Sequence, residues 1–228
     1  MHWQKLIDAS RLYRERVEKA NEAYDLHMKE REQKQWELDG EPSDEEVASL
    51  IKFINGWATR YPSDPHSQAS LKKAYEHVLP RLKLLEGCDI VEARLDSQVA
   101  AGETLSKTTQ EVFETLASAG TKHQWTGASK ILHVLRPRLF VMWDTAIRGG
   151  YAVSESSEDY ACLFLPRMQR EVREAVGSYI MENNCGPRTA VQELEKRGGG
   201  RPITKLLDEY NYCRFTATPR CRFLELWE

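Results

Sequence analysis

The chain has 228 residues, of which 41% are hydrophobic and 29% are charged, and its formal net charge is −3 at pH 7. This length suits one domain, or two small lobes that share a core, and the composition is ordinary for a globular protein. The slightly negative charge excludes a uniformly basic nucleic-acid binder, although it does not exclude a local basic face.

The sequence also argues against several kinds of site. It has no run of 18 apolar residues, so no membrane-spanning helix is expected, and the amphipathic N-terminal segment lacks the features of a signal peptide. The five cysteines are odd in number and irregularly spaced, which fits neither a zinc site nor an iron–sulfur site. We therefore expect reduced thiols, a cytoplasmic location, no metal and no cofactor.

The first predicted element is a long N-terminal helix over residues 1–38. Apolar residues recur at steps of three, four or seven between Trp3 and Met28, which gives one apolar stripe. The stripe could be a coiled-coil seam, but sustained heptads are not evident, and packing on the domain core is favoured.

Residues 43–103, together with the C-terminal helices, are expected to form one lobe of a single helical domain that spans residues 1–228. Ser43 and Glu46 have the spacing of a capping box, which opens a helix. Pro65 suits the first position of the next helix, in which Pro80 could cause a kink.

Residues 104–150 are expected to form the second lobe. One helix is predicted from Thr104 or Ser106 to Gly120, and another over residues 126–135. A short connection joins them and gives this lobe the form of a helical hairpin.

Most of the remaining chain is also predicted to be helical. Pro166 is expected to divide an apolar run into two helices, and the Gly/Pro-rich segments 186–187 and 198–202 separate two short C-terminal helices. Because no segment alternates clearly in the manner of a strand, beyond a weak pattern at the tail, the predicted fold class is all-α.

Basic residues gather between residues 120 and 150, where a single acidic residue, Asp144, accompanies them. These basic residues are Lys122, Lys130, Arg136, Arg138 and Arg148. The local imbalance indicates a polyanionic partner or, with equal weight from charge alone, a solvated surface without a partner.

Asp144 opens a predicted helix directly after the apolar stretch Leu139–Trp143. A carboxylate at a helix N-cap accepts hydrogen bonds from the free N–H groups of the first turn, and the helix dipole favours its charged form. Arg148 follows one turn later, close enough to pair with it. The alternative role is an ordinary N-cap, which contributes about 1 kcal/mol.

Residues 104–148 resemble the helix-hairpin-helix DNA glycosylase superfamily, which includes the endonuclease-III-like and adenine-glycosylase-like enzymes. Ala128 matches the alanine of the second motif helix, Phe140–Trp143 match the apolar loop, and Asp144-Thr145 match the essential Asp-Thr pair. The resemblance implies an all-α, helix-hairpin-helix glycosylase-like fold with the long N-terminal helix added. It also implies a monomeric enzyme that acts on double-stranded DNA with Asp144 as its catalytic residue.

Two departures from the family pattern refine this expectation. The position of the catalytic lysine of the lyase-active members holds Thr126, so a monofunctional glycosylase is implied. The hairpin lacks the family's Gly-x-Gly, so the phosphate contacts must come from other groups. The expected DNA-binding residues are Lys122, His123, Gln124, Thr126, Gly127, Lys130 and Arg148.

The expected reaction begins when the target nucleotide is flipped out of the duplex into a pocket. Ionised Asp144 would stabilise the oxocarbenium-like sugar and orient or deprotonate the attacking water. Aromatic side chains would stack on the extruded base, although a tryptophan is more often a core residue than a base-stacking one. The candidates for this base pocket are Trp57, Tyr61, Trp125 and Trp143.

Two other functions remain open: a DNA-binding helix-hairpin-helix module without catalysis, and a helical adaptor that binds proteins through the N-terminal helix. The sequence does not identify the base. Members of the superfamily remove mismatched uracil or thymine, alkylated or oxidised purines, or mispaired adenine. A hypermodified cytosine of phage DNA would instead make the role antiviral defence rather than DNA repair.

Overall fold

The structure is a computed structural model of the chain, described for residues 1–36, 38, 40–57, 61–120 and 123–217. Its helices are α1 (Trp3–Arg16), α2 (Glu18–Gln33), α3 (Asp44–Gly56), α4 (Pro65–Leu84), α5 (Leu105–Ala117), α6 (Trp125–Leu135), α7 (Thr145–Tyr151), α8 (Ser157–Asp159), α9 (Leu165–Asn183), α10 (Pro187–Arg197) and α11 (Ile203–Asn211), with π-helical turns η1 (Tyr160–Phe164) and η2 (Tyr212–Thr216). The predicted all-α fold class is confirmed. Against the expectation of no strands, β1 (Gln98–Ala100) and β2 (Glu103–Thr104) form a small antiparallel hairpin.

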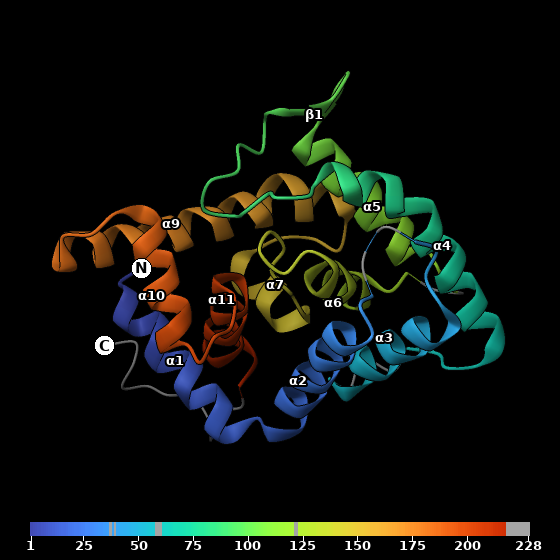
Figure 1. Cartoon of the computed structure of the whole chain (residues 1–228), viewed down its shortest axis with the longest axis horizontal. Helices are drawn as coiled ribbons and strands as arrows, with labels where there is room; N and C mark the ends of the chain where they lie inside the picture. Colours follow the sequence, from blue (N-terminus) through green and yellow to red (C-terminus); the bar gives the residue numbers. More distant parts are fainter. Residues whose placement is uncertain (37, 39, 58–60, 121–122, 218–228) are drawn as a thin grey trace.

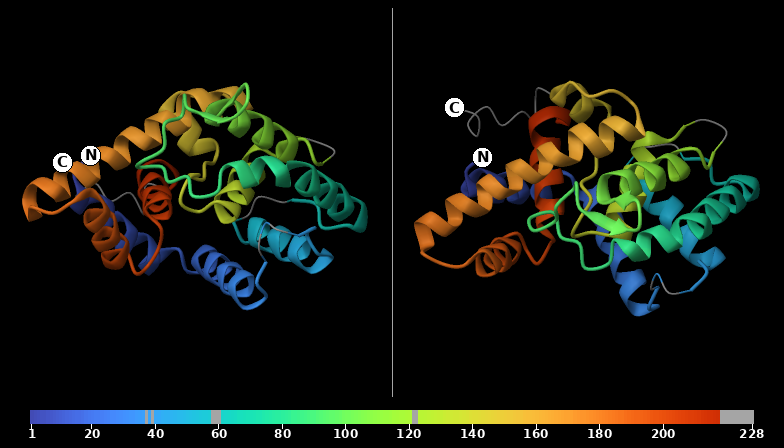
Figure 2. Two further views of the ribbon diagram at one scale, coloured as in Figure 1. Left: turned by 45° about the horizontal axis from the view of Figure 1, so that its top comes forward. Right: turned by 90° about the horizontal axis from the view of Figure 1, so that it is seen from above.

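Helices α6, α7 and α11 occupy the middle of the molecule in Figure 1, and the other long helices surround them. Helix α6 packs against α5 and α3, while α11 packs against α1, α9 and α10. Every residue of α6 from Gly127 to Leu135 is buried, as expected for a helix covered on all sides. Figure 2 shows from two further directions how α10 folds back beside α9.

The N-terminal segment forms two helices, so the predicted single helix over residues 1–38 is wrong. Val17 lies between them with φ −118° and ψ 56°, outside the helical region. The break lets the two halves pack on different surfaces: α1 packs on α11 and α9, and α2 packs on α3. The apolar stripe therefore faces the domain core, not a coiled-coil partner.

The helix starts around α3 and α4 follow the predicted chemistry. The Ser43 hydroxyl caps α3 by accepting the N–H of Glu46 at 3.1 Å. The Glu46 carboxylate accepts a hydrogen bond from the Tyr75 hydroxyl at 2.8 Å, so it ties α3 to α4. Pro65 is the first residue of α4, which continues through Pro80 to Leu84.

Pro166 does not separate two helices, contrary to the prediction. It lies in the first turn of α9, which follows η1 without a gap. The missing N–H of Pro166 falls at the junction between η1 and α9, where the helical hydrogen-bond pattern changes. The chain therefore passes from the π-helical turn η1 into the α-helix α9 without leaving the helical conformation.

Candidate functional site

Asp144 is the N-cap residue of α7, as predicted. Its Oδ1 atom accepts the N–H of Ile147 at 2.8 Å, and its Oδ2 atom accepts the Thr216 hydroxyl at 2.7 Å. The carboxylate is half-buried. Two hydrogen bonds from separate parts of the chain, α7 and η2, therefore fix its orientation.

Trp143 anchors the backbone that carries Asp144. Its N–H and carbonyl both lie 3.2 Å from the hydroxyl of Ser129 on α6, and its indole N–H donates to the Trp125 carbonyl at 3.2 Å. The side chain is 1% exposed and packs edge-on against Phe113. The apolar run before Asp144 thus holds the carboxylate against the start of α6.

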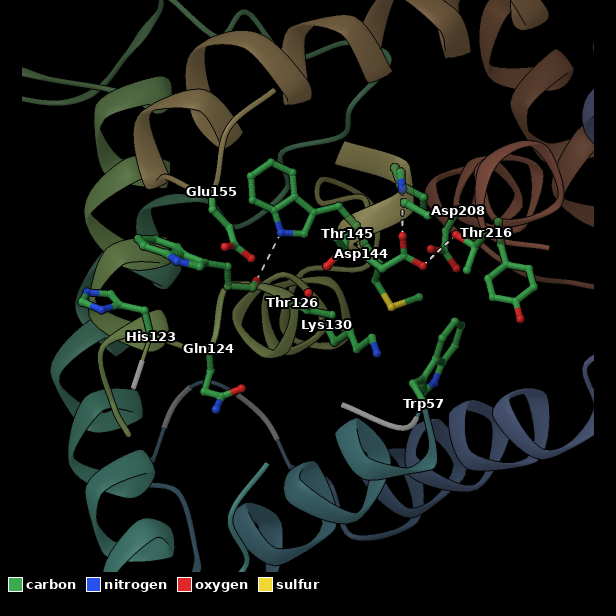
Figure 3. A pocket seen from close by; sticks show the side chains of 16 residues that line it. Trp57, His123, Gln124, Thr126, Lys130, Asp144, Thr145, Glu155, Asp208 and Thr216 are labelled. Atoms are coloured by element: carbon green, nitrogen blue, oxygen red, sulfur yellow. Dashed lines mark hydrogen bonds between the residues drawn. The ribbon is translucent and has the colours of Figure 1, made fainter. Parts of the chain in front are cut away.

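The Asp144 carboxylate faces an open pocket of about 540 Å³ (Figure 3). Aromatic side chains form part of its wall: Trp57, Trp125, Trp143 and Tyr212. Its polar and charged lining comes from α6 and the segments around it: His123, Gln124, Thr126, Lys130, Asp144, Thr145, Glu155, Asp208 and Thr216. The pocket therefore brings together residues from α3 to η2 that lie far apart in the sequence.

Lys130 lines this pocket from the middle of α6 and is 3% exposed. Its Nζ atom lies 5.0 Å from the centre of the Trp57 ring. Burial lowers the pKa of Lys130 to about 7, although the charges of Asp208 and Asp144 act in the opposite direction. Lys130 was expected among the DNA-binding residues, and the structure places it in the wall of the pocket and not on an open surface.

Asp208 is a further carboxyl of the pocket, besides Asp144 and Glu155, that sequence reasoning did not single out. It lies on α11, is 2% exposed, and accepts a hydrogen bond from Lys205 at 2.7 Å. Burial raises its pKa to about 6, against the effect of Lys205. No local signal marked it, because α11 mixes apolar residues with polar and charged ones, and only the tertiary fold shows that the whole helix is buried.

The N-terminus of α6 forms the rim of the pocket. His123 and Gln124 lie on it, and the His123 ring stacks on Trp125 at 5.0 Å. Within the described part of the chain, the N-cap Gln124 makes no side-chain hydrogen bond to the first turn of α6. Thr126 also lines the pocket, whereas Lys122 lies outside the described residues.

Gly127 and Tyr61 have packing roles. Gly127 is buried, and a Cβ atom there would lie 3.4 Å from the Tyr61 ring, so the glycine permits close packing. Tyr61 is 3% exposed, and its backbone pairs with the Asn55 side chain at 2.6 and 2.9 Å. It is not among the residues that line the pocket, unlike the other three predicted aromatic residues.

Arg148 does not pair with Asp144, which corrects the expectation from their spacing. It forms an ion pair with Glu155, a pocket residue, and donates to the Thr145 hydroxyl at 3.1 Å. Its guanidinium lies 5.3 Å from the Trp143 ring. Arg148 is 5% exposed, so the structure places it beneath the pocket wall and not on an open surface.

The described residues include no group of three or more His, Cys, Asp or Glu side chains arranged to hold a metal ion. Four cysteines, Cys88, Cys162, Cys185 and Cys213, are free thiols, and Cys221 lies outside the described part. In the described part of the chain, no helix has the length and apolar character needed to cross a membrane.

Comparisons with protein-family models, curated proteins and solved structures find no match for this chain. Its function is therefore inferred from the chemistry of the pocket.

Proposed function

We propose that this protein is a monofunctional DNA glycosylase. It would flip a damaged or modified base out of double-stranded DNA and hydrolyse the N-glycosidic bond, leaving an abasic site. The observation that carries the proposal is the fixed Asp144 carboxylate at an open pocket with aromatic walls.

The hydrogen bonding of Asp144 suits a residue that stabilises positive charge. Each carboxylate oxygen has more than one lone-pair site; Oδ1 accepts a hydrogen bond from the Ile147 N–H, and Oδ2 accepts one from the Thr216 hydroxyl. The remaining acceptor capacity is available to a water molecule or to a sugar in the pocket. A carboxylate that is already oriented needs little rearrangement as positive charge develops on the sugar.

The aromatic wall supports the binding of an extruded base. Trp57 is half-buried and lines the pocket near Asp144, as Figure 3 shows. Trp125 lies near the rim with His123 stacked on it. Aromatic faces of this kind stack on bases without requiring a particular base sequence.

The start of α6 supports a contact with the DNA backbone. The first turn of a helix leaves N–H groups without intrahelical partners, and the helix dipole favours a negative charge there. Because His123, Gln124 and Thr126 line the same pocket, a phosphate bound at this helix start would hold its nucleotide beside Asp144.

The reaction follows from these positions. As the bond between C1′ and the base nitrogen breaks, its electron pair leaves with the base and the sugar becomes cationic. Asp144 stabilises this cation and accepts a proton from water, whose oxygen attacks C1′. The phosphodiester backbone is not cut in these steps.

Mass spectrometry of released bases tests the proposal. Undamaged, chemically damaged and phage DNA would be incubated with the parent protein, Asp144→Asn and Asp64→Asn. Asp64 is a suitable control because it caps α4 through the N–H groups of His66 and Ser67, away from the pocket. We expect base release by the parent and by Asp64→Asn, but not by Asp144→Asn.

A gel-shift assay at low salt accompanies this experiment. DNA binding without release of a base from any DNA would contradict the glycosylase and support the alternative, a DNA-binding module without catalysis. A protein that neither binds DNA nor releases a base would contradict both functions.

A further inference from the structure

We infer that Lys130 is the catalytic proton donor to the leaving base in this pocket. This inference rests on the proposed glycosylase function and extends it. Asp144 stabilises the sugar cation and accepts a proton from water, but it does not supply a proton to the departing base.

The position of the Lys130 amine is the first reason. In Figure 3 it points into the space between Asp144 and Trp57. Its Nζ atom lies 5.0 Å from the centre of the Trp57 ring. A base that is bound against Trp57, with its sugar at Asp144, therefore comes into contact with this amine.

The burial of Lys130 is the second reason. The residue is 3% exposed although an ordinary lysine stays in water, and it lies on the pocket side of α6. A contact with phosphate at the surface does not explain this buried position. Contact between the amine and a ligand inside the pocket explains it.

The charges around the amine are the third reason. Asp144 from the start of α7 and Asp208 from α11 favour the protonated amine, whereas Lys205 from α11 and burial oppose it. The resulting pKa of about 7 leaves roughly half of the amines protonated at neutral pH. A donor whose pKa lies near the working pH is best suited to general acid catalysis.

The proton balance closes within the pocket. When the C1′–N bond breaks, the base takes the bonding electron pair and receives a proton from the Lys130 ammonium. Water adds its oxygen to C1′ and gives a proton to Asp144. That proton then returns to the neutral Lys130 amine, so one water is consumed and both side chains are restored.

Single-turnover rates of base release test this role between pH 5.5 and 9, with the DNA that the parent protein is found to cleave. The variant is Lys130→Met. The control is Lys72→Met, because Lys72 is a half-buried lysine on α4 that pairs with Asp44 and does not line this pocket. We expect the parent rate to fall as the pH rises through about 7. Lys130→Met should be about 10²-fold slower or more and should lose this dependence, while Lys72→Met should match the parent.

Several results would overturn the inference while leaving the glycosylase intact. One is a parent rate that does not fall between pH 6 and 8.5, a measurement that needs no variant. A second is a rate of base release by Lys130→Met that equals the parent rate. A third is a rate in that variant that falls with pH as the parent rate does. Trapping of a covalent adduct on Lys130 with borohydride would show attack on carbon instead of proton transfer. If the parent releases no base at all, the proposed function fails first.

Discussion

Two buried lysines near the centre of the molecule differ in their surroundings. Lys205 on α11 is completely buried and forms ion pairs with Asp208 at 2.7 Å and Glu209 at 3.5 Å. Glu209 also pairs with Arg201 and accepts a hydrogen bond from Ser10 on α1. We call these five residues the α11 cluster. Lys130 on α6 is also buried, and both amines lie over the Trp57 ring, but only Lys130 lines the open pocket.

The difference separates a buried lysine inside the fold from a buried lysine that a ligand in the pocket can reach. In the α11 cluster, ion pairs and hydrogen bonds offset part of the cost of burying the charged groups, although burial still raises the pKa of Asp208 to about 6. At Lys130, burial outweighs the neighbouring carboxylates, and the pKa falls to about 7. Asp208 is part of both the α11 cluster and the pocket, because it pairs with Lys205 and lines the pocket.

The largest expected effect comes from breaking the α11 cluster. Lys205→Met removes the partner of Asp208 and one partner of Glu209, and it should lower the free energy of unfolding by about 3–5 kcal/mol. Urea denaturation at pH 7 measures the loss. Lys130→Met is the matched change on the pocket side and should cause no comparable loss. Equal destabilisation by the two substitutions would remove the distinction.

The second effect concerns the pH dependence of stability. Between pH 7 and 10.5 the unfolded chain keeps the proton on Lys130, whereas the folded chain releases it, so the stability of the parent rises with pH. The slope from this group is at most about 1.4 kcal/mol per pH unit. Lys130→Met lacks this gain. Urea denaturation from pH 7 to 9.5 should therefore show parent stability increasing relative to the variant, and parallel curves would contradict the lowered pKa.

The smallest expected effect sharpens the role of the aromatic wall. Trp57→Ala should lower kcat/KM for base release by an amount equivalent to about 1–3 kcal/mol of stacking, and Trp57→Phe should retain most of the activity. Trp36→Ala is the control, because Trp36 is a half-buried tryptophan that contacts Lys34 and does not line this pocket. Equal kcat/KM values for Trp57→Ala and Trp36→Ala would exclude stacking on Trp57.

Local sequence chemistry predicted much of the fold. The Ser43 cap, the proline at the start of α4 and the Asp144 N-cap depend on a few neighbouring residues, and all are present. The break at Val17 was missed because the apolar stripe continues through it. Helices α1 and α2 pack on different helices, and the spacing of apolar residues along the sequence does not show this difference.

The pocket was predicted only in part for a similar reason. Asp144 was found because the apolar run and the helix start lie beside it in sequence. Asp208 and Thr216 reach the pocket from α11 and η2, and only the tertiary fold brings them there. The local sequence of Lys130 does not show its burial, because the packing of α6 against α5 and α3 comes from the tertiary fold.

The rate of base release by Asp144→Asn in a single turnover tests the central claim most directly. We predict a rate at least about 10²-fold below that of the parent, with DNA affinity and the urea midpoint nearly unchanged. Asp64→Asn, the same change at the cap of α4, should keep the parent rate. A rate for Asp144→Asn equal to that of the parent would contradict the assignment of this carboxylate to catalysis.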